Sequence, residues 1–136
     1  MEPPFRVMPR LDQDNEFFWT SGKDGQLRFL RCLKCRYYVH PPVPICPACL
    51  GRELAPEVVS GDAVLWSYTV NFQQWAPGTE EPYVIGLVEF IEQDGLRLTT
   101  NIVAEPDEVT VGMPVHVVFE DHDPVFIPLF EPAAPR

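Results

Sequence analysis

Four cysteines, arranged as two Cys-x-x-Cys pairs, are the residues whose spacing points most clearly to chemistry. Cys32 and Cys35 form the first pair, and ten residues separate it from the second pair, Cys46 and Cys49. Two short loops of this spacing turn four sulfurs toward one point, where a tetrahedral set of thiolates selects zinc or iron. The protein would supply all four ligands and leave no position for water or substrate, so the predicted site is structural rather than catalytic.

The residues alone leave other uses of the cysteines open. Disulfide bonds are disfavoured because residues 1–10 lack the apolar core of a secretory signal, and a reducing cytoplasm is expected. A redox-active pair usually opens a helix within a βαβ unit, which the pattern does not predict. Iron is compatible with four sulfurs, but the surrounding basic residues and the lack of a second redox motif favour zinc. One Zn²⁺ is therefore expected to hold together a segment that is too rich in proline for a sheet ladder. The prolines are Pro41, Pro42, Pro44 and Pro47.

The charge of the chain is divided unevenly along its length. The 136 residues include 20 acids and 10 bases, for a net charge of −10. Residues 1–52 hold eight bases and five acids, whereas residues 53–136 hold two bases and fifteen acids. A first part of charge +3 and a second part of charge −13 indicate two units with different surfaces. No apolar run approaches the roughly 20 residues of a membrane helix, so a soluble cytoplasmic protein is expected.

A short helix is predicted upstream of the cysteines, between a polar cap and a glycine. Asp12 or Asp14 would cap its N-terminus, and Gly22 would end it. The aromatic run at residues 17–19 is too apolar for a free helix of two turns, so the helix must pack on this chain or on a partner.

Five strands are predicted downstream of the cysteines. They are expected at residues 63–72, 83–91, 96–103, 115–120 and 125–130. Alternation along the first of them would bury Val64, Trp66, Tyr68 and Val70 on one face. A long first strand and a crossover between the third and fourth are typical of a small five-stranded Greek-key barrel of the OB type. A small β-sandwich is the alternative fold.

A set of short motifs, taken in order, resembles the family first catalogued as domain of unknown function 35. The motifs are Phe18-Trp19, Gly25-x-Leu27, the two cysteine pairs, Pro41-Pro42, Gly61, Trp66-Ser67-Tyr68-Thr69 and Val111-Gly112-Met113-Pro114-Val115. The resemblance implies an all-β fold in which a short helix and a rubredoxin-like zinc ribbon precede an OB-fold barrel. It divides the chain into an arm with the helix (1–25), the ribbon (26–55), the barrel (56–131) and a tail (132–136). One departure is that Arg36 and Leu50, rather than glycine, follow the second cysteine of each pair.

The resemblance also implies a function. Members of this family assemble with thiolase-fold enzymes, or with hot-dog-fold enoyl-CoA hydratases, and serve acyl-CoA chemistry in lipid metabolism. They are non-catalytic subunits that stabilise the enzyme and help to form its acyl-CoA site. We therefore expect a subunit of a hetero-oligomer that is not an enzyme by itself. The reaction of the complex would be acyl transfer or an aldol or retro-aldol step, including the shortening of steroid side chains.

Two sets of residues are candidates for contact with acyl-CoA or with the partner. The first set would supply cations to the CoA phosphates and consists of Arg28, Arg31, Lys34 and Arg36. The second would line an acyl channel or an interface and consists of Trp66, Phe72 and Trp75. A solvated basic face and the barrel core are the plain structural alternatives for the two sets. Trp75 lies in a loop between breakers and is the strongest interface candidate.

Nucleic acid is the main alternative ligand, because OB barrels bind single strands on aromatic faces. The charge of −13 in the barrel half opposes phosphate binding, so this alternative is disfavoured. Catalysis by this chain is also disfavoured. His40, His116 and His122 have no serine or cysteine partner at a motif spacing, and His40 is expected on the surface of the ribbon.

Overall fold

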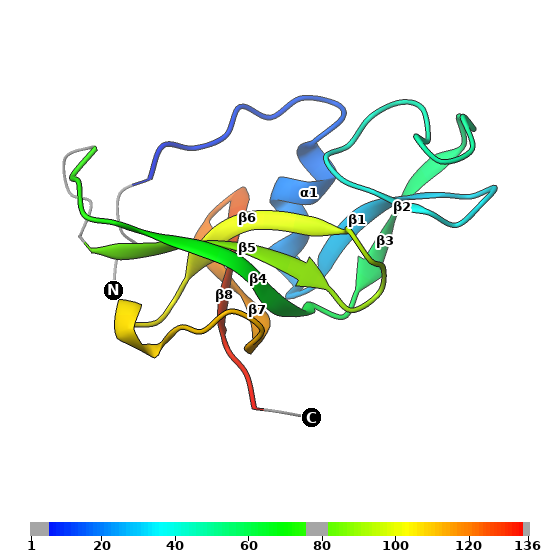
Figure 1. Ribbon diagram of the computed structural model, residues 1–136. Coiled ribbons are helices and arrows are strands. Elements are labelled where there is room, and N and C mark those ends of the chain that lie inside the picture. Colours follow the sequence, from blue (N-terminus) through cyan, green and yellow to red (C-terminus); the bar gives the residue numbers. More distant parts are fainter. Residues whose placement is uncertain (1–5, 76–81, 135–136) are drawn as a thin grey trace.

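A small three-stranded sheet lies beside a closed five-stranded barrel, with a short helical segment over their junction (Figure 1). The computed structural model describes residues 6–75 and 82–134. The start of the predicted arm (1–5), most of the loop that follows Trp75 (76–81) and the end of the tail (135–136) lie outside the described residues. No helix in the described ranges is long and apolar enough to cross a bilayer.

The three-stranded sheet carries the cysteine-rich segment. Its strands are antiparallel and stand in the order β2 (Tyr38–Val39), β1 (Leu27–Cys32), β3 (Leu54–Val59). β3 then leads directly into the barrel, whose strands follow the order β4-β5-β6-β8-β7. The barrel strands are β4 (Asp62–Asn71), β5 (Tyr83–Phe90), β6 (Arg97–Ile102), β7 (Pro114–His122) and β8 (Val125–Pro132). A 3-10 turn, η2 (Pro106–Glu108), lies in the crossover between β6 and β7. The predicted five-stranded OB barrel with a preceding ribbon and short helix is confirmed.

The helical segment begins and ends later than predicted. Asn15, not Asp12 or Asp14, precedes α1 (Glu16–Thr20), because the Asp12 side chain accepts backbone N–H groups within the preceding turn. α1 is followed directly by a 3-10 turn, η1 (Ser21–Asp24), which contains Gly22. The helical segment ends at Gly25, whose φ is 78°.

Gly22 has a packing role instead of ending the helix. A Cβ at this position would lie 2.4 Å from the Phe119 ring and 2.8 Å from Phe126 Cβ. The missing side chain therefore lets η1 approach β7 and β8 closely. Of the two predicted alternatives, the aromatic run packs on this chain. Phe18 is buried, and Phe17 and Trp19 pack against the same core.

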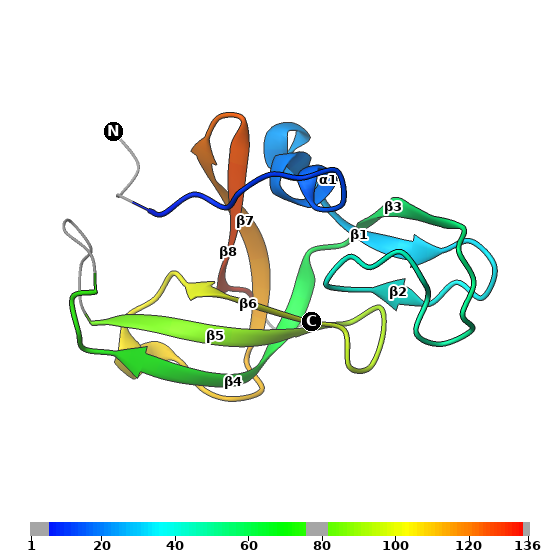
Figure 2. The ribbon, with the colours of Figure 1, turned by 90° about the horizontal axis from the view of Figure 1, so that it is seen from above.

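A row of aromatic rings joins the helix, the ribbon sheet and the barrel in one core. Phe29 on β1 stacks with Phe18 at 6.0 Å and meets Phe90 on β5 edge-on at 4.7 Å. Phe90 in turn meets Phe130 on β8 at 5.7 Å. The ribbon sheet and the barrel thus share a single hydrophobic core, although the charge division falls between them. Figure 2 shows the sheet seated against one side of the barrel, with α1 above the junction.

His40 is half-buried against this core and does not lie on the open ribbon surface where it was predicted. Its ring lies 4.9 Å from that of Phe18 and 4.8 Å from that of Phe29. Burial lowers the pKa of His40 to about 4, so the imidazole is neutral at physiological pH. His40 directly follows β2, and the pairing of β2 with β1 places it at the junction. The adjacent prolines alone do not predict this position.

The facing of the first barrel strand differs from the prediction before its bulge, whereas Val70 packs against the core as predicted. Ala63 and Leu65 point into the barrel, while Val64, Trp66 and Tyr68 are exposed. Unbroken alternation places the set with Ser67, Thr69 and Asn71 outside, but the alternation changes phase at residue 66, so Ala63 and Leu65 point inward before that point. A bulge between Leu65 and Ser67 further shifts the register against β5.

Replacement of Phe29 by alanine is predicted to cost about 3–5 kcal/mol of unfolding free energy, because the ring is fully buried at the junction. Chemical denaturation of the two proteins measures the difference. Phe72→Ala is the matched control, since Phe72 is mostly exposed and its loss should change stability by less than about 0.5 kcal/mol. Equal effects of the two substitutions would contradict the shared core.

Candidate metal centre and partner surface

The four cysteines converge at one end of the ribbon sheet. Their sulfurs all lie within 4.8 Å of one another, with 3.6 Å between Cys32 and Cys49 and 3.6 Å between Cys35 and Cys46. These separations are far longer than the roughly 2.05 Å of a disulfide bond. They are close to the roughly 3.8 Å expected between thiolates that surround Zn²⁺ at about 2.3 Å. The predicted ligands are therefore brought together in an arrangement that fits a tetrahedral metal.

The two cysteine pairs sit in knuckles with the same backbone hydrogen bonds. In the first, the N–H of Arg36 donates to the carbonyl of Cys32 at 2.9 Å, and the N–H of Cys32 donates to the carbonyl of Tyr37 at 2.9 Å. In the second, the corresponding bonds are Leu50 to Cys46 at 2.8 Å and Cys46 to Gly51 at 2.9 Å. Each knuckle is thus closed by its own backbone hydrogen bonds.

Backbone dipoles in the knuckles also favour thiolates. The N–H of Cys35 points at the Cys32 sulfur from 3.5 Å, and this hydrogen bond leads the effects that lower the pKa of the Cys32 thiol to about 6. The N–H of Gly51 approaches the Cys49 sulfur at 3.4 Å. A side chain at Gly51 would crowd both Cys49 and Cys32, at 3.1 and 3.6 Å from their sulfurs.

The two residues that replace the usual glycine of a knuckle have a left-handed backbone. Arg36 and Leu50, the residues after the second cysteine of each pair, have φ values of 69° and 64°. This left-handed region normally favours glycine. Both positions therefore keep the conformation that the knuckle requires although the residue type differs.

Three of the four basic candidates beside the site are already paired with carboxylates. Arg28 binds Asp24 at 2.7 Å, and Arg31 binds Glu57 at 2.6 Å while lying 4.2 Å above the Tyr38 ring. Arg36 reaches the second oxygen of Glu57 at 3.0 Å. Lys34 is exposed and has no ion pair within the described parts of the chain. These residues lie on the ribbon sheet and its first knuckle, so they form a basic surface whose charge is largely compensated.

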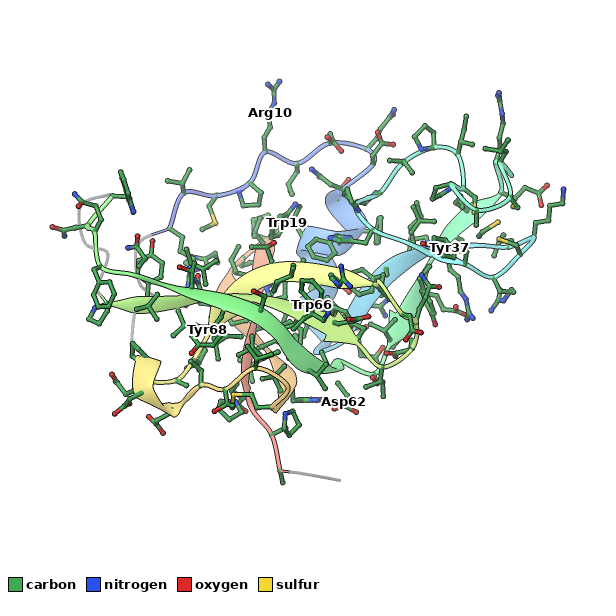
Figure 3. All side chains as sticks on the ribbon, in the orientation of Figure 1. Arg10, Trp19, Tyr37, Asp62, Trp66 and Tyr68 are labelled. Carbon is green, nitrogen blue, oxygen red and sulfur yellow. The ribbon has the colours of Figure 1, made fainter. Side chains whose placement is uncertain are left out.

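The three aromatic candidates lie along β4 and just beyond it, and all are exposed. Trp75 is 75% exposed, Phe72 is 73% exposed and Trp66 is 46% exposed. The indole N–H of Trp75 donates to Asn71 Oδ1 at 2.6 Å, which orients the ring. The guanidinium of Arg97 lies 3.8 Å above the Trp66 ring. None of these rings is in the core, so the core alternative does not apply to them. Figure 3 shows Trp66 on β4.

A cleft that the sequence did not reveal opens near Trp75. It has a volume of about 950 Å³ and runs between the N-terminal arm and the ends of β5, β6 and β8. Its lining is mostly apolar and includes Trp19, Trp75, Tyr83, Ile102, Ile127 and Leu129. At the arm side, Arg6 is hydrogen-bonded and ion-paired to Glu120 and reaches Asn101 at 3.1 Å. No local sequence signal could have found this arrangement, because Arg6 and Glu120 are 114 residues apart.

The histidines do not form a catalytic group in the described structure. His116 pairs with Asp62 at 2.7 Å, and His122 pairs with Glu120 at 2.6 Å. His40 lies between aromatic rings. Within the described residues, no serine or cysteine is hydrogen-bonded to any of the three, so no nucleophile–base pair is present there.

Comparison with protein-family models assigns both parts of the chain. Residues 19–55 match the rubredoxin-like zinc ribbon domain of ChsH2, and residues 57–120 match its C-terminal OB-fold domain. The chain belongs to the ChsH2 family. The resemblance to domain of unknown function 35 is thereby confirmed, and with it a ribbon built to hold one structural zinc through Cys32, Cys35, Cys46 and Cys49.

Solved structures agree with this assignment. The ChsH2-family chain described here superposes on a chain of the Ltp2-ChsH2(DUF35) aldolase with a TM-score of 0.83 and 36% identity. The match covers 93% of this chain and 100% of that one. A Sulfolobus solfataricus protein of the DUF35 family, of unknown function, shares the fold with a TM-score of 0.65 at 19% identity, over 89% of this chain and 86% of that one.

Two curated proteins are also similar. A probable enoyl-CoA hydratase alpha subunit of Thermomonospora curvata is 37% identical over 96% of this chain. The 3-oxo-4,17-pregnadiene-20-carboxyl-CoA hydratase alpha subunit of Mycobacterium tuberculosis is 32% identical over 89% of it. The ChsH2-family chain spans 41% and 38% of the lengths of these relatives.

Cys32→Ser is predicted to abolish stable zinc binding, because it removes one of four ligands from a closed site. Elemental analysis of the purified protein should find about one zinc per parent chain and a loss in the variant. Arg36→Ala, beside the site but not a ligand, should retain the metal. Equal zinc content in the parent and the Cys32 variant would contradict the proposed ligand set.

Leu50→Gly is predicted to raise the unfolding free energy of the zinc-bound protein by up to about 1 kcal/mol, because it relieves the left-handed backbone at no packing cost. Leu33→Gly, at an exposed leucine of the other knuckle without positive φ, should instead destabilise the protein. Thermal unfolding of both variants tests this contrast, and destabilisation by both would refute it.

Proposed function

We propose that this chain is a non-catalytic subunit of a hetero-oligomeric enzyme that acts on acyl-CoA thioesters, with a thiolase-fold partner carrying the catalytic groups. The observation that carries the proposal is the pairing of a closed four-sulfur site with exposed aromatic side chains on the barrel. A metal with four protein ligands has no open position for chemistry. Large exposed rings such as Trp75 and Phe72 are typical of residues that become buried when a partner binds.

The relatives support the same kind of role. The matched solved chain is part of a complex called an aldolase, and its whole length corresponds to this chain. We propose a retro-aldol or aldol step, or acyl transfer, as the reaction of the assembled complex, with the side chain of a steroid thioester as one candidate substrate. Reduced thiolates at the metal site are compatible with a reducing compartment, and we propose the cytoplasm.

The acyl-CoA site of such a complex would lie mainly on the partner, with this chain forming one wall. The apolar cleft near Trp75 offers a surface for an acyl group. Lys34 has no ion pair within the described parts of the chain, but it lies in the first knuckle at the opposite end of the molecule, so it would not serve the same CoA as the cleft (Figure 2). Arg28, Arg31 and Arg36 would have to exchange a carboxylate partner to bind CoA, so they are the weaker candidates.

A hot-dog-fold enoyl-CoA hydratase is the second candidate partner. Both curated relatives are called hydratase alpha subunits, and this chain corresponds to less than half of each. Nucleic acid has less support, because Arg97, which lies over Trp66, also lies 3.5 Å from Glu89 and is compensated by it.

Co-expression with the Ltp2 subunit of the matched aldolase is the experiment that tests the proposal. A stable complex with retro-aldol activity on a β-hydroxyacyl-CoA, and no activity of either chain alone, is the expected result. Co-purification with a hot-dog hydratase but not with a thiolase-fold enzyme would move the proposal to the second partner. A salt-sensitive complex with an oligonucleotide, and with neither enzyme, would overturn it.

Trp75→Ala is predicted to weaken this complex about tenfold or more without changing the unfolding free energy of the isolated chain, because the ring is exposed when free. Isothermal titration or an equivalent binding measurement gives the dissociation constant. Ile91→Ala, at another exposed apolar residue on a different loop, is the control and should leave the affinity unchanged. Equal affinities of the Trp75 variant and the parent would place Trp75 outside the interface.

A further inference from the structure

The C-terminal half of β4 has an open strand edge. β4 pairs with β5 from Ala63 to Asn71, but it pairs with β7 only from Asp62 to Val64. The loop before β7 extends this second pairing by one residue, because Leu65 exchanges hydrogen bonds with Met113 and Gly112. Beyond Leu65, no backbone hydrogen bond on this side of β4 is present among the described residues. The C-terminal half of β4 therefore runs beside β5 as the outer strand of a ribbon that extends past the rest of the barrel (Figure 2).

The register identifies which backbone groups face the open edge. Leu65 directs its N–H and C=O toward the loop before β7, and therefore away from β5. In an antiparallel pair, two opposite residues either bond each other or both point away, so Val88, which lies opposite Leu65, directs its N–H and C=O toward β6. Orientation alternates along β5, so Gly86 and Val84 also face β6. Their partners on β4 are Tyr68 and Val70.

The N–H and C=O groups of Tyr68 and Val70 therefore point away from β5 into the open edge. Because the two residues are two positions apart on a strand, these groups repeat about every 6.7 Å, the spacing that an added strand requires.

This edge lacks the features that usually protect a free strand. Natural proteins blunt exposed edges with charged residues, proline, bulges or a covering segment. Residues 66–71 read Trp-Ser-Tyr-Thr-Val-Asn and contain neither a charge nor a proline. The bulge lies before this stretch, between Leu65 and Ser67, and leaves the register regular from Ser67 to Asn71. Trp66 and Tyr68, both exposed, project from the same strand (Figure 3).

We propose that an extended segment of the partner enzyme pairs with the open edge of β4 at Tyr68 and Val70, extending the sheet by one strand. The inference rests on the proposed function for the existence of that partner. The added strand would take hydrogen bonds from the two free N–H groups and give hydrogen bonds to the two free carbonyls. Its alternate side chains would lie against Trp66 and Tyr68.

The charge around the edge selects this occupant over a second copy of the chain. The half of the chain that contains β4 has a net charge of −13. Glu105 and Glu108, which cap and end η2, line the same cleft as Trp75, so acidic side chains lie near the C-terminal end of β4. Edge-to-edge pairing of two copies would bring two such acidic surfaces together. The segment that fits is therefore an extended strand in which Lys or Arg alternates with apolar residues.

Amide hydrogen exchange, resolved to single residues, tests the pairing on the full chain alone and in its complex with Ltp2. In the free chain, the amides of Tyr68 and Val70 should exchange fast, while those of Ser67 and Thr69, which face β5, are protected. In the complex, the exchange of Tyr68 and Val70 should slow by about tenfold or more. The amides between β5 and β6 serve as the internal control and should be protected in both states.

Tyr68→Pro and Tyr68→Ala separate the backbone bond from the side chain. Both remove the ring, but only proline removes the N–H, and at an open edge this change is compatible with folding. The proline variant should bind Ltp2 about tenfold more weakly than the alanine variant. Far-ultraviolet circular dichroism and zinc content check that both variants are folded, and the exchange measurement on the parent chain decides the question if the proline variant is not.

The outcomes distinguish this inference from the proposed function. A complex that forms and is active, but leaves Tyr68 and Val70 exchanging fast, overturns the strand pairing and leaves the proposed function standing. Failure of Ltp2 to bind at all, with fast exchange under every condition, overturns both. Protection of the two amides in the free chain that increases with protein concentration would show a second copy at the edge, and it would overturn the choice of occupant.

Discussion

The contact of Phe29 with the rings of Phe18 and Phe90 is the interaction on which the rest of the structure depends. Phe29 lies on β1, between the knuckles and the barrel, and is fully buried. Through it the helix, the ribbon sheet and the barrel bury their apolar surfaces in one core. The cysteine-rich segment is too small to form a core of its own, and it is stabilised by packing on this shared core. The four sulfurs then need to stabilise only the far end of the ribbon sheet.

The metal site and the shared core stabilise opposite ends of the ribbon. At the knuckle end, only Cys32, Cys46 and Val39 form the buried cluster, which is too little apolar surface for stability without ligands. At the barrel end, the aromatic rings pack together, and the neutral imidazole of His40 lies against Phe29. The ribbon is consequently fixed at both ends, and the basic surface of its first knuckle is held in a constant position beside the acidic barrel.

This construction leaves the candidate partner surfaces on the barrel, at the end away from the metal. The exposed rings, the apolar cleft and the open edge of β4 all lie around the ribbon formed by β4 and β5. A chain that completes its own core and closes its own metal site, yet exposes Phe72 and Trp75, has the properties of a subunit that docks. Membership of the ChsH2 family, one of whose solved relatives belongs to an aldolase complex, is in keeping with that design.

The sequence by itself predicted the metal ligands and the five strands, because both depend on local spacing: sulfurs brought together by short loops, and strands separated by recognisable turns. That spacing left a barrel and a sandwich open, and the resemblance to a known family selected the OB-type barrel. It could not determine which residues of β4 face inward, because the bulge between Leu65 and Ser67 that changes the phase of the alternation depends on pairing with the distant strand β5. His40 and Gly22 received the wrong roles for the same reason, because their neighbours Phe29 and Phe119 come from distant strands. The bond from Arg6 to Glu120 forms because the fold brings two distant segments together. The edge of β4 at Tyr68 is open because β7 pairs with β4 only as far as Val64. Only the tertiary structure decided these two features.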